Sequence, residues 1–285
     1  MLASFVLPGL LALAAAACSS AGSADPPDPA RAEGGSGADG PVGQTNDEDG
    51  GPGVDGGKKK DATAGDGGDD GLLGTLTSGA CGTLKAELLK ATPSVLNNAI
   101  AFAAGEAYDK PSLSPGGQRL FDTPNAGGSS TESETMSYEV LRHCEGAVLL
   151  KTETEITYEP PDPMAANTIT DILMEIDGKK IGVSVTRTYK PSSQGPMTDD
   201  AVKALLEKKL IGIIRSSERV LPADKWVKQV FHVFSPNKAS TDAIARVIPT
   251  IDAAVRADTI ILVTETKGGG FVYCHPLPPL GMECP

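Results

Sequence analysis

Three polar residues of one predicted β-hairpin carry side chains that could do chemistry: Asp171, Ser184 and Thr186. They belong to residues 170–187, TDILMEIDGKKIGVSVTR, in which Asp177-Gly178 is typical of a two-residue hairpin turn. Folding about this turn brings Asp171 opposite Ser184 or Thr186, depending on the register. A carboxylate beside hydroxyls is a candidate binding or catalytic site, and the structural alternative is an edge hairpin with a solvated face.

The strands on either side of the turn alternate between two kinds of side chain. Successive side chains of a strand point to opposite faces, so an aliphatic row predicts the face that packs on the core. That row consists of Ile172, Met174, Ile176, Ile181, Val183 and Val185. The candidate polar residues therefore share the opposite face.

The segments around the hairpin predict further elements in a regular order. We expect two helices broken at Pro93 in residues 83–106, and a loop over residues 109–131. The later elements are a helix from Thr131 or Ser133 to about His143, a strand over 147–158, a helix over 198–220, a strand over 226–234, a helix over 240–256 with a kink at Pro249, and a strand over 259–264. The order α-β-β-β-α-β-α-β predicts an α/β fold with a mixed β-sheet flanked by helices.

That order and several short motifs resemble the PD-(D/E)xK nuclease-like superfamily, whose fold is restriction-endonuclease-like. The resemblance is to an uncharacterised branch of the superfamily and extends from Glu132 to about Glu265. The matching motifs are Ser133-Glu134-Thr135, Ser137-Tyr138-Glu139, LLKTETEITY at 149–158, TDI at 170–172 and IGVSVTR at 181–187.

The resemblance implies roles for individual residues. Asp171 matches the motif aspartate, and Glu134 or Glu139 matches the helix acid that completes a Mg²⁺ shell. Ser184 stands where the second acid belongs, and Thr186 stands where the lysine belongs. By resemblance, the catalytic candidates are Asp171, Ser184, Thr186 and Glu134, and the metal-ligand candidates are Asp171 and Glu134.

The two hydroxyl residues depart from the superfamily's chemistry, because a hydroxyl is a poor Mg²⁺ ligand and threonine carries no positive charge. This favours a non-catalytic nuclease-like domain used for binding or structure. The alternative is a divalent-metal-dependent nuclease with a displaced active site around Asp171. In that case Glu153 and Glu155 could supply carboxylates, and Lys151 or Arg187 could supply the charge.

The N-terminal residues predict export. Residues 1–17 read as a signal peptide, and Ala15-Ala16-Ala17-Cys18 resembles the lipobox of bacterial lipoproteins. This resemblance implies that Cys18 is lipidated and anchors the chain to a membrane of the cell envelope. Residues 18–73 are rich in Gly and Asp and poor in large apolar side chains, which predicts a disordered tether.

The charge of the chain is concentrated in that tether. The formal net charge is −12, and residues 19–73 hold twelve acidic residues against four basic ones. The rest is only mildly acidic and shows no basic stripe, so nucleic acid remains a possible partner that the charge does not indicate.

Four cysteines follow Cys18, and in an exported chain an even number is consistent with two disulfides in any of three connectivities. Cys274 and Cys284 enclose a Pro-rich tail and form the preferred pair, which leaves Cys81 with Cys144 by elimination. Beyond the tether, we predict a helical lead-in and loop over 74–130, the nuclease-like domain over 131–268 and a Cys/Pro-rich tail over 269–285.

Overall fold

The computed structural model describes residues 72–79, 81–126, 130–160, 168–190, 194–277 and 281–283, which belong to one compact unit, Ala62–Pro285. The predicted signal peptide, Cys18 and the tether as far as Gly71 lie outside the described residues. The predicted end of the tether was wrong, because Leu73 is buried in the hydrophobic core. Within the described part of the chain, no helix is long and apolar enough to cross a membrane.

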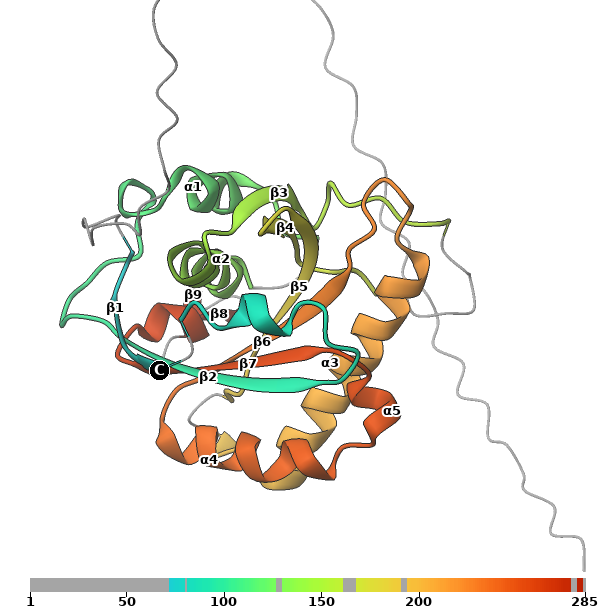
Figure 1. The fold of residues 1–285 in the computed structure, drawn as a ribbon. Helices are drawn as coiled ribbons and strands as arrows, with labels where there is room; N and C mark the ends of the chain where they lie inside the picture. The colour runs from blue at the N-terminus through green and yellow to red at the C-terminus, as the bar shows by residue number, and fades with distance from the viewer. Residues whose placement is uncertain are drawn as a thin grey trace, which may run out of the picture. The chain divides into compact units, whose positions relative to one another are not determined.

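The unit is built on a seven-stranded sheet with the order β1-β2-β7-β6-β5-β4-β3 (Figure 1). Its strands are β1 (Thr75–Gly79), β2 (Ser94–Ala101), β3 (Val148–Thr152), β4 (Ile172–Ile176), β5 (Lys179–Arg187), β6 (Lys228–Ser235) and β7 (Ile260–Lys267). The four central strands β2, β7, β6 and β5 are parallel, whereas β1, β4 and β3 pair antiparallel at the two edges. A small separate sheet pairs β8 (His275–Leu277) with β9 (Gly281–Glu283).

Helices cover both faces of the sheet (Figure 1). One face carries α1 (Pro115–Asp122) and α2 (Thr131–Glu145), and the other carries α3 (Asp199–Arg219), α4 (Lys238–Val247) and α5 (Ala253–Arg256). Short 3₁₀ turns lie at Leu84–Glu87, Lys110–Ser112, Ile248–Thr250 and Gly270–Tyr273. Separate hydrophobic clusters fill the two sides of the sheet. The α/β class with a mixed, helix-flanked sheet is thus confirmed.

The predicted hairpin is present as β4 and β5. Asp177 and Gly178 form the turn with φ values of 52° and 70°, the left-handed region that such a turn requires. Ile172 pairs with Val183, so the register places Asp171 opposite Ser184 rather than Thr186. The six aliphatic residues of the predicted row are all buried in one core cluster.

Most of the remaining elements follow the predicted order, with shifted ends. The strand predicted over 147–158 is shorter than expected, because β3 ends at Thr152 in a turn closed by the hydrogen bond from Glu155 N to Thr152 O (3.0 Å). The helix expected over 240–256 begins at Lys238, where the Asn237 side chain accepts from Ser240 N. It is interrupted by the 3₁₀ turn that contains Pro249.

The prediction for residues 83–106 was wrong. Only a short 3₁₀ turn occurs at Leu84–Glu87, and residues 94–101 form β2. The apolar residues of SVLNNAIA have helix-like spacing, but tertiary pairing overrides it, because β2 lies between β7 and β1 and bonds to both. The loop expected over 109–131 also contains α1, whose N-cap Ser114 accepts from Gly117 N.

A disulfide joins Cys81 to Cys144, with a Cα–Cα distance of 4.5 Å, and confirms the second predicted pair. It fixes the segment after β1 to the end of α2. There Glu145 Oε1 accepts from the backbone N–H groups of Gly82 (2.8 Å) and Leu84 (3.3 Å). Cys274 also takes part in a disulfide, and Cys284 lies outside the described residues.

Candidate metal centre

Three carboxylates meet at one end of the hairpin. Glu134, Glu153 and Asp171 each offer an oxygen within 4.8 Å of the other two. Glu134 lies in the first turn of α2, Glu153 directly follows β3, and Asp171 directly precedes β4. The fold therefore brings together the two predicted metal ligands and one of the two carboxylates considered for a displaced site.

Each of these carboxylates is oriented by a hydrogen-bond donor. The donors are Asn125 Nδ2 to Glu134 Oε1 (3.1 Å), the backbone N–H of Ala126 to Glu153 Oε1, and the backbone N–H of Val185 to Asp171 Oδ2 (2.5 Å). No described residue donates a hydrogen bond to the second oxygen of Asp171 or of Glu153. These two oxygens remain available to a ligand.

The environment of the cluster favours neutral carboxyl groups. Glu134 is 5 % exposed and Glu153 is 8 % exposed. Burial, together with the charge of Asp171, raises the pKa of Glu134 to about 8. Burial also raises the pKa values of Glu153 and Asp171, and the nearby Lys209 partly opposes both shifts. Among the described residues, no basic side chain forms an ion pair with any of the three carboxylates.

A cavity of about 770 Å³ opens beside the cluster. Glu153, Asp171 and Ser184 line it from the hairpin side, and Lys209 lines it from α3. Sequence reasoning missed Lys209. A signal was present, because Lys209 lies between Leu206 and Ile213 on the helix stripe that packs toward the sheet.

The two hydroxyl residues of β5 line two different cavities. Ser184 (5 % exposed) lines the 770 Å³ cavity with Asp171, whereas Thr186 (8 % exposed) lines a second cavity of about 310 Å³. Neither hydroxyl forms a hydrogen bond with another described residue. Asp171 and Thr186, which the motif would place in one site, therefore face different spaces.

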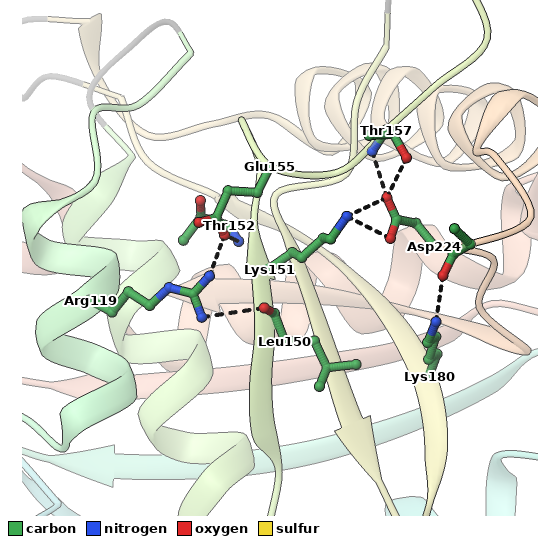
Figure 2. A network of polar contacts seen from close by, with 9 residues as sticks. Arg119, Leu150, Lys151, Thr152, Glu155, Thr157, Lys180 and Asp224 are labelled. Atoms are coloured by element: carbon green, nitrogen blue, oxygen red, sulfur yellow. Dashed lines mark hydrogen bonds and ion pairs between the residues drawn. The ribbon is translucent and has the colours of Figure 1, made fainter.

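Lys151 and Glu155, two candidates for a displaced site, are engaged elsewhere (Figure 2). Lys151 forms an ion pair with Asp224 (2.7 Å), whose carboxylate also accepts from Thr157 N (2.8 Å). Glu155 pairs with Arg119 of α1 (2.5 Å). The hypothesis that these two side chains contribute to the site around Asp171 is therefore wrong.

Two further candidates also lie outside the carboxylate cluster. Glu139 is fully buried and accepts hydrogen bonds from Ser114 N (2.9 Å) and Arg142 Nε (3.2 Å). Arg187 donates to the backbone oxygens of Val272 (3.2 Å) and Cys274 (2.8 Å), and it lines the 310 Å³ cavity. Of the helix acids, Glu134 is thus the one at the site.

The fold and site define an α/β domain with a buried carboxylate cluster beside a cavity. No protein-family model matches the chain. Over 171 residues the chain is 40 % identical to the AAC-rich mRNA clone AAC4 protein of Dictyostelium discoideum. The match covers 56 % of this chain and 24 % of the relative, so the chain spans about a quarter of that protein's length.

Proposed function

We propose that this chain is an exported protein whose α/β domain binds a divalent cation and hydrolyses phosphodiester bonds on a PD-(D/E)xK nuclease-like scaffold. The observation that carries the proposal is the convergence of Glu134, Glu153 and Asp171 within 4.8 Å. The order of strands and helices around the cluster supports the same scaffold.

The donor set fits a hard divalent cation, because Mg²⁺ and Mn²⁺ prefer carboxylate oxygens. Two ionised carboxylates whose oxygens lie within 4.8 Å of each other would repel by at least roughly 3 kcal/mol at an effective dielectric constant of about 20. The cluster relieves this repulsion either by taking up protons, as the raised pKa of Glu134 indicates, or by binding a cation.

The chain's own residues have distinct parts in this proposal. Asp171 and Glu153 hold the cation through the oxygens that accept no hydrogen bond from a described residue, and Glu134 completes the set. Lys209, which lines the same cavity, supplies the positive charge that Thr186 lacks and stabilises charge on the phosphoryl oxygens. When bound, the cation supplies Lewis-acid chemistry and lowers the pKa of a water molecule.

A second candidate function is non-catalytic binding on the same scaffold. It is favoured by the two substitutions on β5, because Ser184 and Thr186 replace the second acid and the lysine of the superfamily's motif. The ligand would then occupy the cavity beside Asp171 without being cleaved.

Export is supported by the Cys81–Cys144 disulfide, because structural disulfides persist in oxidising compartments. The lipid anchor at Cys18 and its membrane partner remain predictions from the sequence. Attachment to the cell envelope would direct the domain toward substrates outside the cytoplasm.

We expect the full chain to bind Mn²⁺ and Mg²⁺ saturably in calorimetric titrations. Asp171→Asn should weaken binding at least about tenfold, since loss of even an outer-shell group costs 10–100-fold. Asparagine keeps an oxygen for the Val185 N–H, so the variant isolates the charge. The matched control is Glu175→Gln, which removes an exposed carboxylate from the same hairpin. Equal binding by all three proteins, or none, would contradict the proposed cation site.

Cleavage of bis(p-nitrophenyl) phosphate and of single- and double-stranded DNA and RNA separates the two candidate functions. Hydrolysis that depends on Mn²⁺ and is lost in Asp171→Asn and Lys209→Gln, but kept in Glu175→Gln, supports the enzyme. Saturable cation binding without hydrolysis of any substrate supports non-catalytic binding instead.

A further inference from the structure

The 310 Å³ cavity next to the carboxylate cluster is lined by hydroxyl and basic groups. Ser130 and Ser133 line it from the start of α2, and Thr186 and Arg187 line it from the end of β5. No acidic residue is among the described residues that line it. Ser130 and Lys209 line both this cavity and the larger one, so the two spaces adjoin.

The N-terminus of α2 points its positive end toward this cavity. The helix has 15 residues, and its N-cap Ser130 makes no side-chain hydrogen bond to the backbone of the first turn. Ser133 Oγ instead donates to the Ser130 backbone oxygen (2.9 Å). Backbone N–H groups at an uncapped helix start bind anions, because they lack partners and carry the positive end of the helix dipole.

Thr186 gives an independent indication of a ligand. Thr186 is 8 % exposed and lines the cavity, and its hydroxyl has no hydrogen-bond partner among the described residues. A hydroxyl that lines a cavity without a protein partner can both donate to and accept from a molecule in that cavity. The Thr186 hydroxyl therefore has hydrogen-bonding capacity for an occupant of the cavity.

Arg187 and Lys209 determine the sign of the charge that the cavity accepts. The Arg187 guanidinium is held at the cavity by the backbone oxygens of Val272 and Cys274. Burial lowers the pKa of Arg187, but the ordinary pKa of a guanidinium is so high that arginine stays protonated in proteins. Two cations, a helix start and several hydroxyls match the oxygens of a phosphate group.

We propose that the cavity lined by Ser130, Thr186, Arg187 and Lys209 binds a phosphate group. The phosphate is either free inorganic phosphate or a non-scissile phosphate of the substrate processed at the adjoining carboxylate cluster. Only the second source rests on the proposed function; phosphate binding as such does not. Because the neighbouring carboxylates oppose an anion until they are neutralised, phosphate and Mn²⁺ should each strengthen binding of the other.

The test is calorimetric titration of sodium phosphate into the full chain at low ionic strength, with and without Mn²⁺. We expect saturable binding that weakens at least about tenfold in Arg187→Gln and several-fold in Thr186→Val. Lys179→Gln removes one charge from the other end of β5 and should bind phosphate like the wild-type protein. Thermal unfolding of each variant reports whether it is folded; Thr186→Val keeps the test valid if loss of the Arg187 contacts unfolds the chain.

Absence of saturable phosphate binding, or equal affinities in all four proteins, would overturn the proposal. Phosphate binding without hydrolysis would support the phosphate cavity and contradict the proposed enzymatic activity. Hydrolysis with no phosphate binding would support the enzymatic activity and contradict the phosphate cavity.

A second titration compares a short oligonucleotide with and without a 5′-phosphate. Tighter binding of the phosphorylated form that Thr186→Val abolishes assigns the cavity to a substrate phosphate, and equal binding of the two forms assigns it to free phosphate.

Discussion

In the absence of divalent cations, the Glu134→Gln variant is expected to unfold at a higher temperature than the wild-type protein at pH 9, and at nearly the same temperature at pH 4. Glu134 is 5 % exposed and faces two other carboxylates. Glutamine keeps an oxygen that can accept from Asn125 but never carries charge. The variant therefore removes the ionisation of Glu134 while it preserves the shape of the site.

Proton linkage determines whether the ionisation of Glu134 stabilises or destabilises the folded state. Burial and the charge of Asp171 raise the pKa of Glu134 from 4.5 to about 8, so between these pH values the folded state binds more protons than the unfolded state. The free energy of unfolding therefore falls as the pH rises through this window. At about 1.4 kcal/mol per pKa unit, the rise from 4.5 to about 8 gives an upper limit on the order of 5 kcal/mol. For a domain of this size that upper limit corresponds to roughly 10–20 °C in Tm.

Saturating Mn²⁺ should reverse the order of the two proteins at pH 9. A ligand that binds only the folded state stabilises it by an amount that grows with the ratio of its concentration to Kd. The wild-type protein, with three carboxylates at the site, should gain more than the variant. Scanning calorimetry at pH 4, 7 and 9, with Glu175→Gln as control, measures both effects. A Tm difference independent of pH would contradict the ionisation of a buried Glu134.

The double variant Cys81→Ala/Cys144→Ala is expected to lose about 4 kcal/mol of the free energy of unfolding. The disulfide spans a sequence separation of 63 residues, and closing a loop of that length removes about 14 cal/mol/K of entropy from the unfolded chain. In the folded state the bond also lies beside the contacts of Glu145 with Gly82 and Leu84. The segment after β1 should therefore loosen first.

Urea denaturation of the oxidised proteins, followed by circular dichroism, measures the loss. The midpoint should fall with little change in slope if the native surface is unaltered. A control variant with Cys274→Ala separates the effect of this bond from the other disulfide. An unchanged midpoint in Cys81→Ala/Cys144→Ala would show that the packing of the segment after β1 does not depend on the covalent link.

The hairpin could be predicted because local signals agreed with the final fold. Asp177-Gly178 supplied the turn geometry, and the alternation of aliphatic residues supplied the buried face. β2 could not be predicted in this way, since Val95, Leu96, Ala99 and Ile100 have a spacing that suits a helix. Its strand state comes from parallel pairing with β7, more than 160 positions away in the sequence.

The candidate site was likewise predictable only in part. Asp171 was found from the hairpin pattern and Glu134 through a family resemblance, and Glu153 was considered only as a replacement ligand. Glu153 joins the cluster and Glu155 pairs with Arg119 because β3 ends at Thr152. The alternation of side chains along the sequence does not locate that strand end. Lys209 enters the cavity from a helix that follows the hairpin in sequence, so only the packing of α3 on the sheet reveals it.

The tight turn at Asp177-Gly178 places a limit on how the chain can vary. It lies six residues from Asp171, or about 20 Å along the strand, yet it determines which residue of β5 stands opposite the carboxylate. An inserted residue that shifted the pairing by a single position would turn either the Asp171 face of β4 or the Ser184 face of β5 toward the hydrophobic core. Insertions and deletions at this remote loop should therefore be as damaging as substitutions of the carboxylate itself.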